Sequence, residues 1–86
     1  MPEVSRFYGI VIQIFYGDHA PSHFHVIYAG QKAMVDIETL ALIEGSLPPR
    51  AMGLVVEWAS IHHDELREAF RQAASMEQPQ KIAPLP

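Results

Sequence analysis

Residues 7–16 read Phe7-Tyr8-Gly9-Ile10-Val11-Ile12-Gln13-Ile14-Phe15-Tyr16, and this stretch decides the predicted fold. Such a run of β-branched and aromatic residues is typical of a long β-strand. Successive side chains of a strand point to opposite faces of the sheet, and both faces of this strand would be largely apolar. One face would carry Ile10, Ile12 and Ile14, and the other Phe7, Val11 and Phe15. We therefore expect a helix on the first face, and on the second either the C-terminal tail or, preferably, a partner.

Three further strands follow the predicted first one. A loop over residues 17–22 contains Pro21, which cannot take part in strand pairing at its own position. Strands are then expected over residues 23–29, 32–37 and 40–44. Gly30-Gln31 suits a type II′ turn between the second and third strands. The sheet, over about residues 7–44, is thus predicted to be a four-stranded antiparallel meander.

The C-terminal half is predicted to be mainly helical. Ser46 is a plausible N-cap, and the prolines that follow are tolerated in a first helical turn. Apolar residues recur at helical spacing over about residues 49–75, which predicts one helix, with a break near Ser60 as the alternative. The extended tail over residues 79–86 is expected to dock over the sheet through Ile82 and Leu85. The residues of the helical stripe are Met52, Val55, Ala59, His62, Leu66, Phe70 and Ala73.

Together these elements predict an α+β fold in which a four-stranded antiparallel meander sheet packs on one long C-terminal helix. With 86 residues, we expect a single domain over residues 1–86. The absence of cysteine excludes disulfides, thiolate metal sites and cysteine nucleophiles. Neither a membrane-spanning apolar run nor a secretion signal is visible, so a cytoplasmic protein without membrane association is expected. A net charge of −4, with scattered Lys and Arg, argues against a sequence-independent grip on DNA.

The best candidate for chemistry is the run from Asp18 to His25, which holds three of the five histidines. Imidazole titrates near neutral pH and is the commonest metal ligand. His23 and His25 are two residues apart on a predicted strand, so both would project from the same face. With His19 or Asp18 as a third ligand from the loop, they would chelate zinc or a similar divalent metal. His62 or His63 could instead reach the site from the helix.

Two other interpretations of the same residues stay open. In a metal-free site, two imidazoles would act as general base and general acid on a phosphodiester, pairing His23 with His19 or His62. Asp18 would then orient an imidazole, and Arg50 or Arg6 would stabilise phosphate charge. Alternatively, the histidines are structural and merely hydrogen-bond main-chain carbonyls, with His63 facing solvent.

Several stretches resemble a bacterial family of small proteins known as the domain of unknown function DUF4160. They are residues 1–10, 18–26, 47–51, 57–59 and 62–66. The histidine run is the most specific of them, although members typically have Pro-Pro-His where this chain has Pro21-Ser22-His23. The resemblance implies a toxin of a type II toxin–antitoxin pair, which is neutralised by a small partner protein. It supplies no established catalytic residues.

We therefore expect a small toxin-like protein whose histidine cluster acts on RNA or another phosphate-bearing substrate, with or without a divalent metal. Nucleic acid would be bound as substrate only. The alternatives are a non-enzymatic protein-binding module and a metal-binding regulator. An antitoxin-like protein or a second copy of the chain is the expected partner. The candidate catalytic residues are Asp18, His19, His23, His25 and His62, and the candidate metal ligands are His19, His23 and His25.

Overall fold

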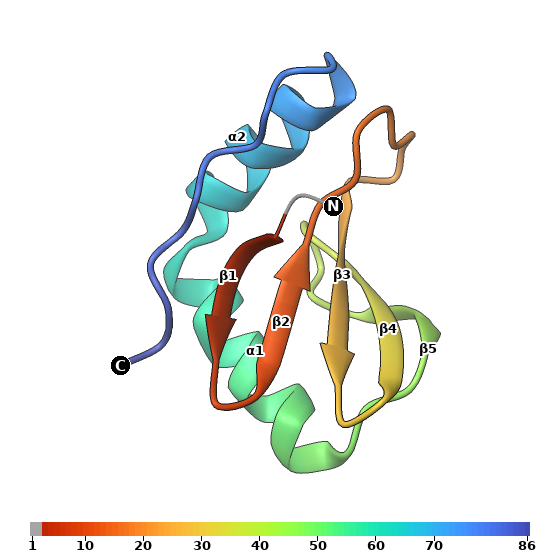
Figure 1. Ribbon diagram of the computed structural model, residues 1–86. Coiled ribbons are helices and arrows are strands. Elements are labelled where there is room, and N and C mark those ends of the chain that lie inside the picture. The colour runs from red at the N-terminus through yellow and green to blue at the C-terminus, as the bar shows by residue number, and fades with distance from the viewer. Residues whose placement is uncertain (1–2) are drawn as a thin grey trace.

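The N-terminal half forms a five-stranded antiparallel sheet in the computed structural model, which describes residues 3–86 (Figure 1). The strands lie in chain order, so each strand pairs with the next one. Met1 and Pro2, which belong to the opening stretch of the family resemblance, lie outside the described residues. The strands are β1 (Glu3–Phe7), β2 (Ile10–Gln13), β3 (His23–Tyr28), β4 (Gln31–Asp36) and β5 (Leu42–Gly45).

The sheet has five strands, not the predicted four, because the chain reverses inside the stretch that was expected to be one strand. Tyr8 and Gly9 have φ values of 51° and 79°, and two left-handed residues in succession are typical of a type I′ hairpin turn. β1 and β2 therefore pair with Phe7 opposite Ile10. This pairing places Phe7 on the same face as Ile10, where it is buried, and the expectation that it lies on the opposite face is wrong.

A second two-residue turn joins β3 to β4 at Ala29 and Gly30, whose φ values are 49° and 79°. The prediction of a type II′ turn at Gly30-Gln31 is wrong by one residue, because both turn residues are left-handed as in a type I′ turn. Tyr28 then faces Gln31 across the hairpin.

Two helices, α1 (Pro49–Ile61) and α2 (His63–Ala74), pack behind the sheet (Figure 1). The predicted single helix is wrong, because the helix is interrupted at His62, where φ is −110° and ψ is 31°. Asp64 and Glu65 lie in the first turn of α2, where negative charge stabilises a helix N-terminus. The N-cap of α1 is Pro48 and not Ser46, and no side chain caps this end.

The core lies between the sheet and the helices, and Trp58 of α1 is its largest fully buried side chain. Its indole ring lies 5.3 Å from the ring of Phe7 and 6.0 Å from that of Phe24, measured between centroids. Aromatic contacts at this range add to the stability that burial alone provides. Leu66 of α2 is also fully buried, so both helices contribute to the core.

The C-terminal tail runs back along the helices to β1, as Figure 1 shows. The Ile82 amide donates a hydrogen bond of 2.8 Å to the Val4 carbonyl, and the Trp58 Nε1–H donates one of 2.8 Å to the Ala83 carbonyl. Ile82 and Leu85 are both buried, as the prediction of a docked tail requires. The tail docks at the edge strand β1 and does not cover the open face of the sheet.

The face of the sheet that turns away from the helices carries half-buried apolar side chains. Register places Val11 beside Ile27, and His25 beside Met34, on this face. At the edge, β5 is exposed along its whole length, including Leu42 and Ile43. Within residues 3–86, no helix is both long and apolar enough to cross a membrane.

Candidate metal centre

The loop between β2 and β3 carries the first group of the candidate site. The Gly17 amide donates a hydrogen bond of 2.9 Å to the Ala73 carbonyl of α2, which ties the start of this loop to the helix layer. At the other end of the loop, the Ser22 carbonyl accepts a 3.0 Å bond from the Ile37 amide. Asp18 directly follows the first of these anchors, so its carboxylate is held beside the first residues of β3.

The two imidazoles come from β3, where alternation places His23 and His25 on the same face of the sheet. His25 is half-buried, whereas His23, at the start of the strand, is buried beside Phe70 of α2. The orientation of the His23 ring is fixed by its Nδ1, which lies 2.7 Å from the Pro21 carbonyl oxygen. A carbonyl only accepts hydrogen bonds, so Nδ1 carries the proton of a neutral His23 ring. Its Nε2 is then left with a lone pair, which is the form that binds a metal.

Three potential ligand atoms converge at this point. The Asp18 Oδ2 lies 3.2 Å from the Nε2 of His23 and 3.4 Å from the Nε2 of His25, and all three atoms lie within 4.8 Å of one another. Two ligands bound to zinc at about 2.0–2.1 Å and at the tetrahedral angle are about 3.3–3.4 Å apart. The two distances that involve Asp18, which are those of histidine–carboxylate ion pairs, are therefore also close to the edge of a zinc coordination tetrahedron.

Aromatic rings hold the imidazoles on either side. The His25 ring lies 4.2 Å from the Phe15 ring, and the His23 ring lies 5.7 Å from the Phe70 ring of α2. Burial lowers the pKa of His25 from its usual value, against the opposing effect of the hydrogen bond to Asp18. The side chains keep different access to solvent: His23 is 9% exposed, His25 20% and Asp18 24%. A metal at this point would thus be reached from the side of Asp18 and His25.

Not all of the predicted site residues belong to this cluster. His19 is exposed in the loop and is not among the converging ligands, so the loop contributes Asp18 in its place. His62 lies at the junction of the helices, with its Nδ1 2.6 Å from the Glu65 Oε1. His63 was expected to face solvent, but it is half-buried, and its Nε2–H donates to the Ile37 carbonyl at 2.7 Å.

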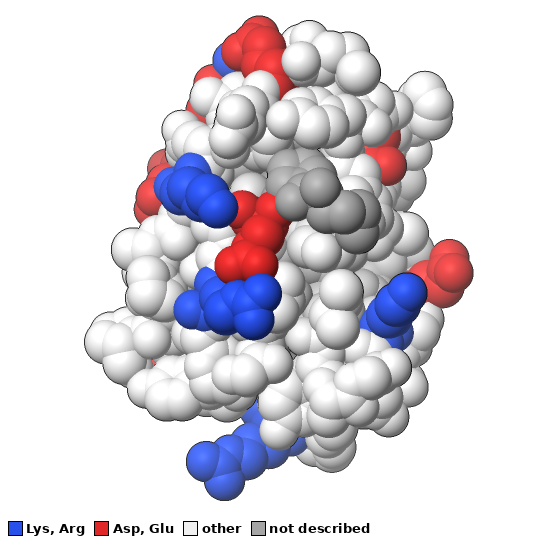
Figure 2. Space-filling model, viewed as in Figure 1, with Lys and Arg blue, Asp and Glu red and all other residues white. Residues whose placement is uncertain are grey.

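The arginines proposed as phosphate-binding groups lie elsewhere in the structure. Arg6 forms an ion pair of 2.7 Å with Glu3 on β1, and Arg50 lines a separate pocket at the start of α1. The Lys and Arg side chains on the face shown in Figure 2 stand apart from one another and form no stripe. The basic group that does accompany the cluster is Lys32, which with His25 lines two shallow hollows of the open sheet face. Cross-strand pairing of β3 and β4 brings it there, and no motif in the sequence marks this lysine.

Comparison with known proteins identifies the family of the chain. No curated protein and no solved structure matches it significantly. A family model described as "Domain of unknown function (DUF4160)" matches residues 9–71, which is well over half of the chain. The matched range contains Asp18, His23 and His25 together with strands β2–β5 and nearly all of the helical region. The chain therefore belongs to the DUF4160 family.

Proposed function

We propose that Asp18, His23 and His25 bind one divalent first-row transition metal ion, with zinc as the first candidate. The observation that carries this proposal is the convergence of one carboxylate oxygen and two imidazole nitrogens within 4.8 Å of one another. Two histidines and one carboxylate are a common ligand set for catalytic zinc and for non-haem iron, and both leave coordination positions open for water.

The fixed orientation of His23 supports a metal site over a simple hydrogen-bond cluster. Metal-binding histidines usually donate their second ring N–H to a carbonyl or carboxylate, and His23 has this partner in the Pro21 carbonyl. Asp18 is held by the loop anchor at Gly17, so the three groups need little rearrangement to meet one ion. A site with ligands held in this way loses little conformational entropy when the metal binds.

We further propose that the metal activates water for hydrolysis of a phosphate-bearing substrate. A metal held by Asp18, His23 and His25 would supply a water-derived nucleophile near neutral pH. Attack of this nucleophile on phosphorus would break the bond to the leaving oxygen, which would take up a proton from solvent. Lys32 supports this substrate class, because it lines the hollows next to His25 and would attract the phosphate group.

Metal binding is tested by titrating metal-free protein with zinc and measuring stoichiometry and affinity by calorimetry. The wild type is expected to bind one equivalent, and Asp18→Asn to bind at least about 100-fold more weakly, since even loss of a ligand's supporting partner costs 10–100-fold. His19→Ala is the matched control, because it removes an exposed imidazole from the same loop and should leave the affinity unchanged. A wild type that binds no better than Asp18→Asn would refute the site.

Hydrolysis is tested with bis(p-nitrophenyl) phosphate. The wild type loaded with zinc or manganese is expected to release p-nitrophenol, and activity should vanish with a chelator and in Asp18→Asn. Activity that survives the chelator would favour the metal-free mechanism, in which His23 and a second histidine, His19 or His62, act as general base and general acid on the phosphodiester. Metal binding without hydrolysis would leave a metal-binding regulator.

A second candidate function, a protein-binding module, is favoured by the edge strand β5. Leu42 and Ile43 are 44% and 43% exposed on a strand whose outer edge pairs with no other described strand. An edge of this kind accepts an added strand from a partner or from a second copy. This property suits a toxin that is neutralised by a small antitoxin in the cytoplasm. The toxin role is tested by expressing the wild type and His23→Ala in bacteria. If growth is unchanged with both, the toxin role is refuted.

A further inference from the structure

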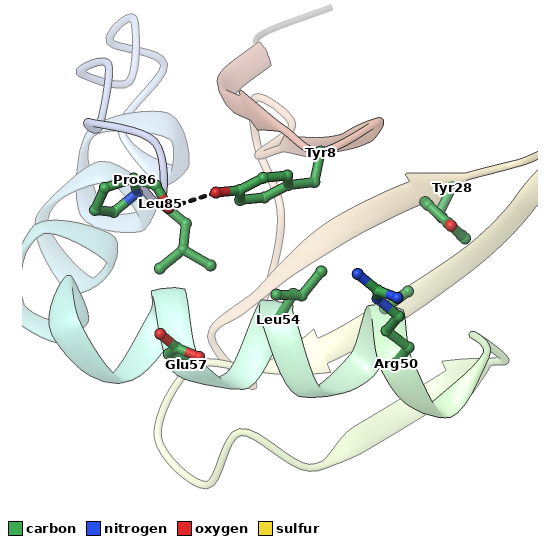
Figure 3. A pocket seen from close by; sticks show the side chains of 8 residues that line it. Tyr8, Tyr28, Arg50, Leu54, Glu57, Leu85 and Pro86 are labelled. Atoms are coloured by element: carbon green, nitrogen blue, oxygen red, sulfur yellow. Dashed lines mark hydrogen bonds between the residues drawn. The ribbon is translucent and has the colours of Figure 1, made fainter.

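A pocket lies away from the histidine cluster, between α1, the turn that joins β1 to β2, and the C-terminal tail. Its volume is about 580 Å³ (Figure 3). Ala51, Leu54 and Leu85 supply an apolar wall, and the two tyrosines Tyr8 and Tyr28 line the side of the sheet. A concave site with an apolar wall and a few polar groups is typical of a small-molecule site.

Arg50 makes one end of this pocket basic. Three other arginines of the chain each form an ion pair of 2.7–2.8 Å with a glutamate, whereas no hydrogen bond or ion pair to Arg50 is found within residues 3–86. An arginine without a partner presents its planar fork to a carboxylate or phosphate group. Arg50 also lies in the first turn of α1, where the helix dipole adds to the positive potential. The arginines with glutamate partners are Arg6, Arg67 and Arg71.

Glu57 makes the opposite end acidic. It follows Arg50 by seven residues, which corresponds to about 10 Å along the same face of an α-helix. Figure 3 shows the two side chains at opposite ends of this face, with Leu54 between them. The pocket therefore attracts a negative group at one end and repels one at the other. A ligand that fits it is charged at one end only.

The tyrosines and the tail complete the site. The Tyr8 hydroxyl donates a hydrogen bond to the Pro86 carbonyl, which closes the pocket on the side of the tail. Tyr28 is half-buried and lines the pocket from the sheet, at the end where Arg50 lies (Figure 3), and its hydroxyl is a further donor. Two aromatic rings and an apolar wall favour a flat, apolar body over a bare inorganic ion.

From these contacts, we propose that the pocket between Arg50, Tyr8, Tyr28 and Glu57 binds a small organic anion, in which a carboxylate or phosphate group is attached to an aromatic body. The anionic group binds Arg50 and the Tyr28 hydroxyl, and the body lies along Leu54 toward Glu57. This site is independent of the metal centre, because neither Asp18 nor either histidine of β3 lines it.

The test is a titration of ¹⁵N-labelled protein, in the presence of a chelator, with benzoate, phenyl phosphate, inorganic phosphate and benzylamine. Benzoate or phenyl phosphate is expected to shift amide signals of Ala51 and Leu54 in a saturable way, and the tighter of the two identifies the anionic group. Inorganic phosphate should bind at least about tenfold more weakly, since it lacks the apolar body. Terephthalate, which carries a second carboxylate at the far end of the ring, should bind more weakly than benzoate because this group would face Glu57.

Two variants assign the binding to the proposed groups. Arg50→Gln should weaken binding of the preferred probe about tenfold or more, whereas Arg67→Gln, which removes an arginine bound to Glu38, should leave it unchanged. Tyr28→Phe should weaken it by a smaller factor and serves as a second variant. The proposal is overturned if neither aromatic anion shifts the pocket signals, if benzylamine or inorganic phosphate binds as well as they do, or if Arg50→Gln binds like the wild type.

Discussion

Replacement of Trp58 by Phe tests how strongly the tail is coupled to the core. Trp58→Phe keeps an aromatic ring against Phe7 and Phe24 but removes the Nε1–H that donates to the Ala83 carbonyl at 2.8 Å. Loss of this hydrogen bond costs about 1 kcal/mol. The smaller ring also leaves a cavity at a site with no solvent exposure, which costs about 1–2 kcal/mol more. We expect the free energy of unfolding to fall by about 2–3 kcal/mol in total.

Urea unfolding followed by far-UV circular dichroism measures this loss. With a slope of about 1–2 kcal/mol/M for a chain of this size, the midpoint should fall by roughly 1–3 M. Hydrogen exchange of the Ile82 amide, which bonds the Val4 carbonyl, should become faster because the tail is less firmly held. Tyr8→Phe is the matched control: it removes another side-chain bond to the tail, to Pro86, at a side chain that is 61% exposed. Equal midpoints for the two variants would refute the argument.

Two further predictions concern glycines and pH. Gly45→Ala should destabilise the protein by at least about 2 kcal/mol in urea unfolding, because φ is +81° and an added Cβ would lie 2.1 Å from the Lys32 carbonyl oxygen. Gly53→Ala, in α1 with open space around the added Cβ, should instead stabilise it by about 0.5–1 kcal/mol, and a loss at both positions would contradict the steric argument. Burial lowers the pKa of His25, so the unfolded state of the metal-free protein binds a proton more readily than the folded state does. The free energy of unfolding should therefore fall as pH decreases from about 6.5 through the lowered pKa. His25→Gln should reduce this dependence in urea midpoints measured from about pH 7 to 5, and an unchanged slope would refute the assignment to His25.

The α+β class, the antiparallel meander and the helical C-terminal half could be predicted from the sequence, but the reversal at Tyr8-Gly9, which adds a fifth strand, could not. A type I′ turn is usually indicated by Asn-Gly or Asp-Gly, and a tyrosine with φ of 51° leaves no such signal. The break at His62 lies close to the alternative break near Ser60, but the spacing of the apolar residues gives no reason to prefer two helices over one. The apolar stripe continues through it to Leu66, because a single non-helical residue barely changes the periodicity.

The candidate site shows the same division between local and long-range information. That His23 and His25 share a face follows from strand alternation alone. Whether Asp18 or His19 joins them depends on the path of the loop, which is set by the bond from Gly17 to Ala73 on α2. Hydrogen bonds between distant segments have no signature in a single sequence. For the same reason, the pocket at Arg50, which needs the tail in place, could not be predicted.

The docking of the tail on β1 has a consequence for assembly. The tail already occupies the β1 edge of the sheet, where the Val4 carbonyl accepts a hydrogen bond from the Ile82 amide. Among the described strands, β5 is the edge strand that stays available for pairing. Edge-to-edge growth of a sheet into fibres requires two free edges, and the docked tail occupies one of them.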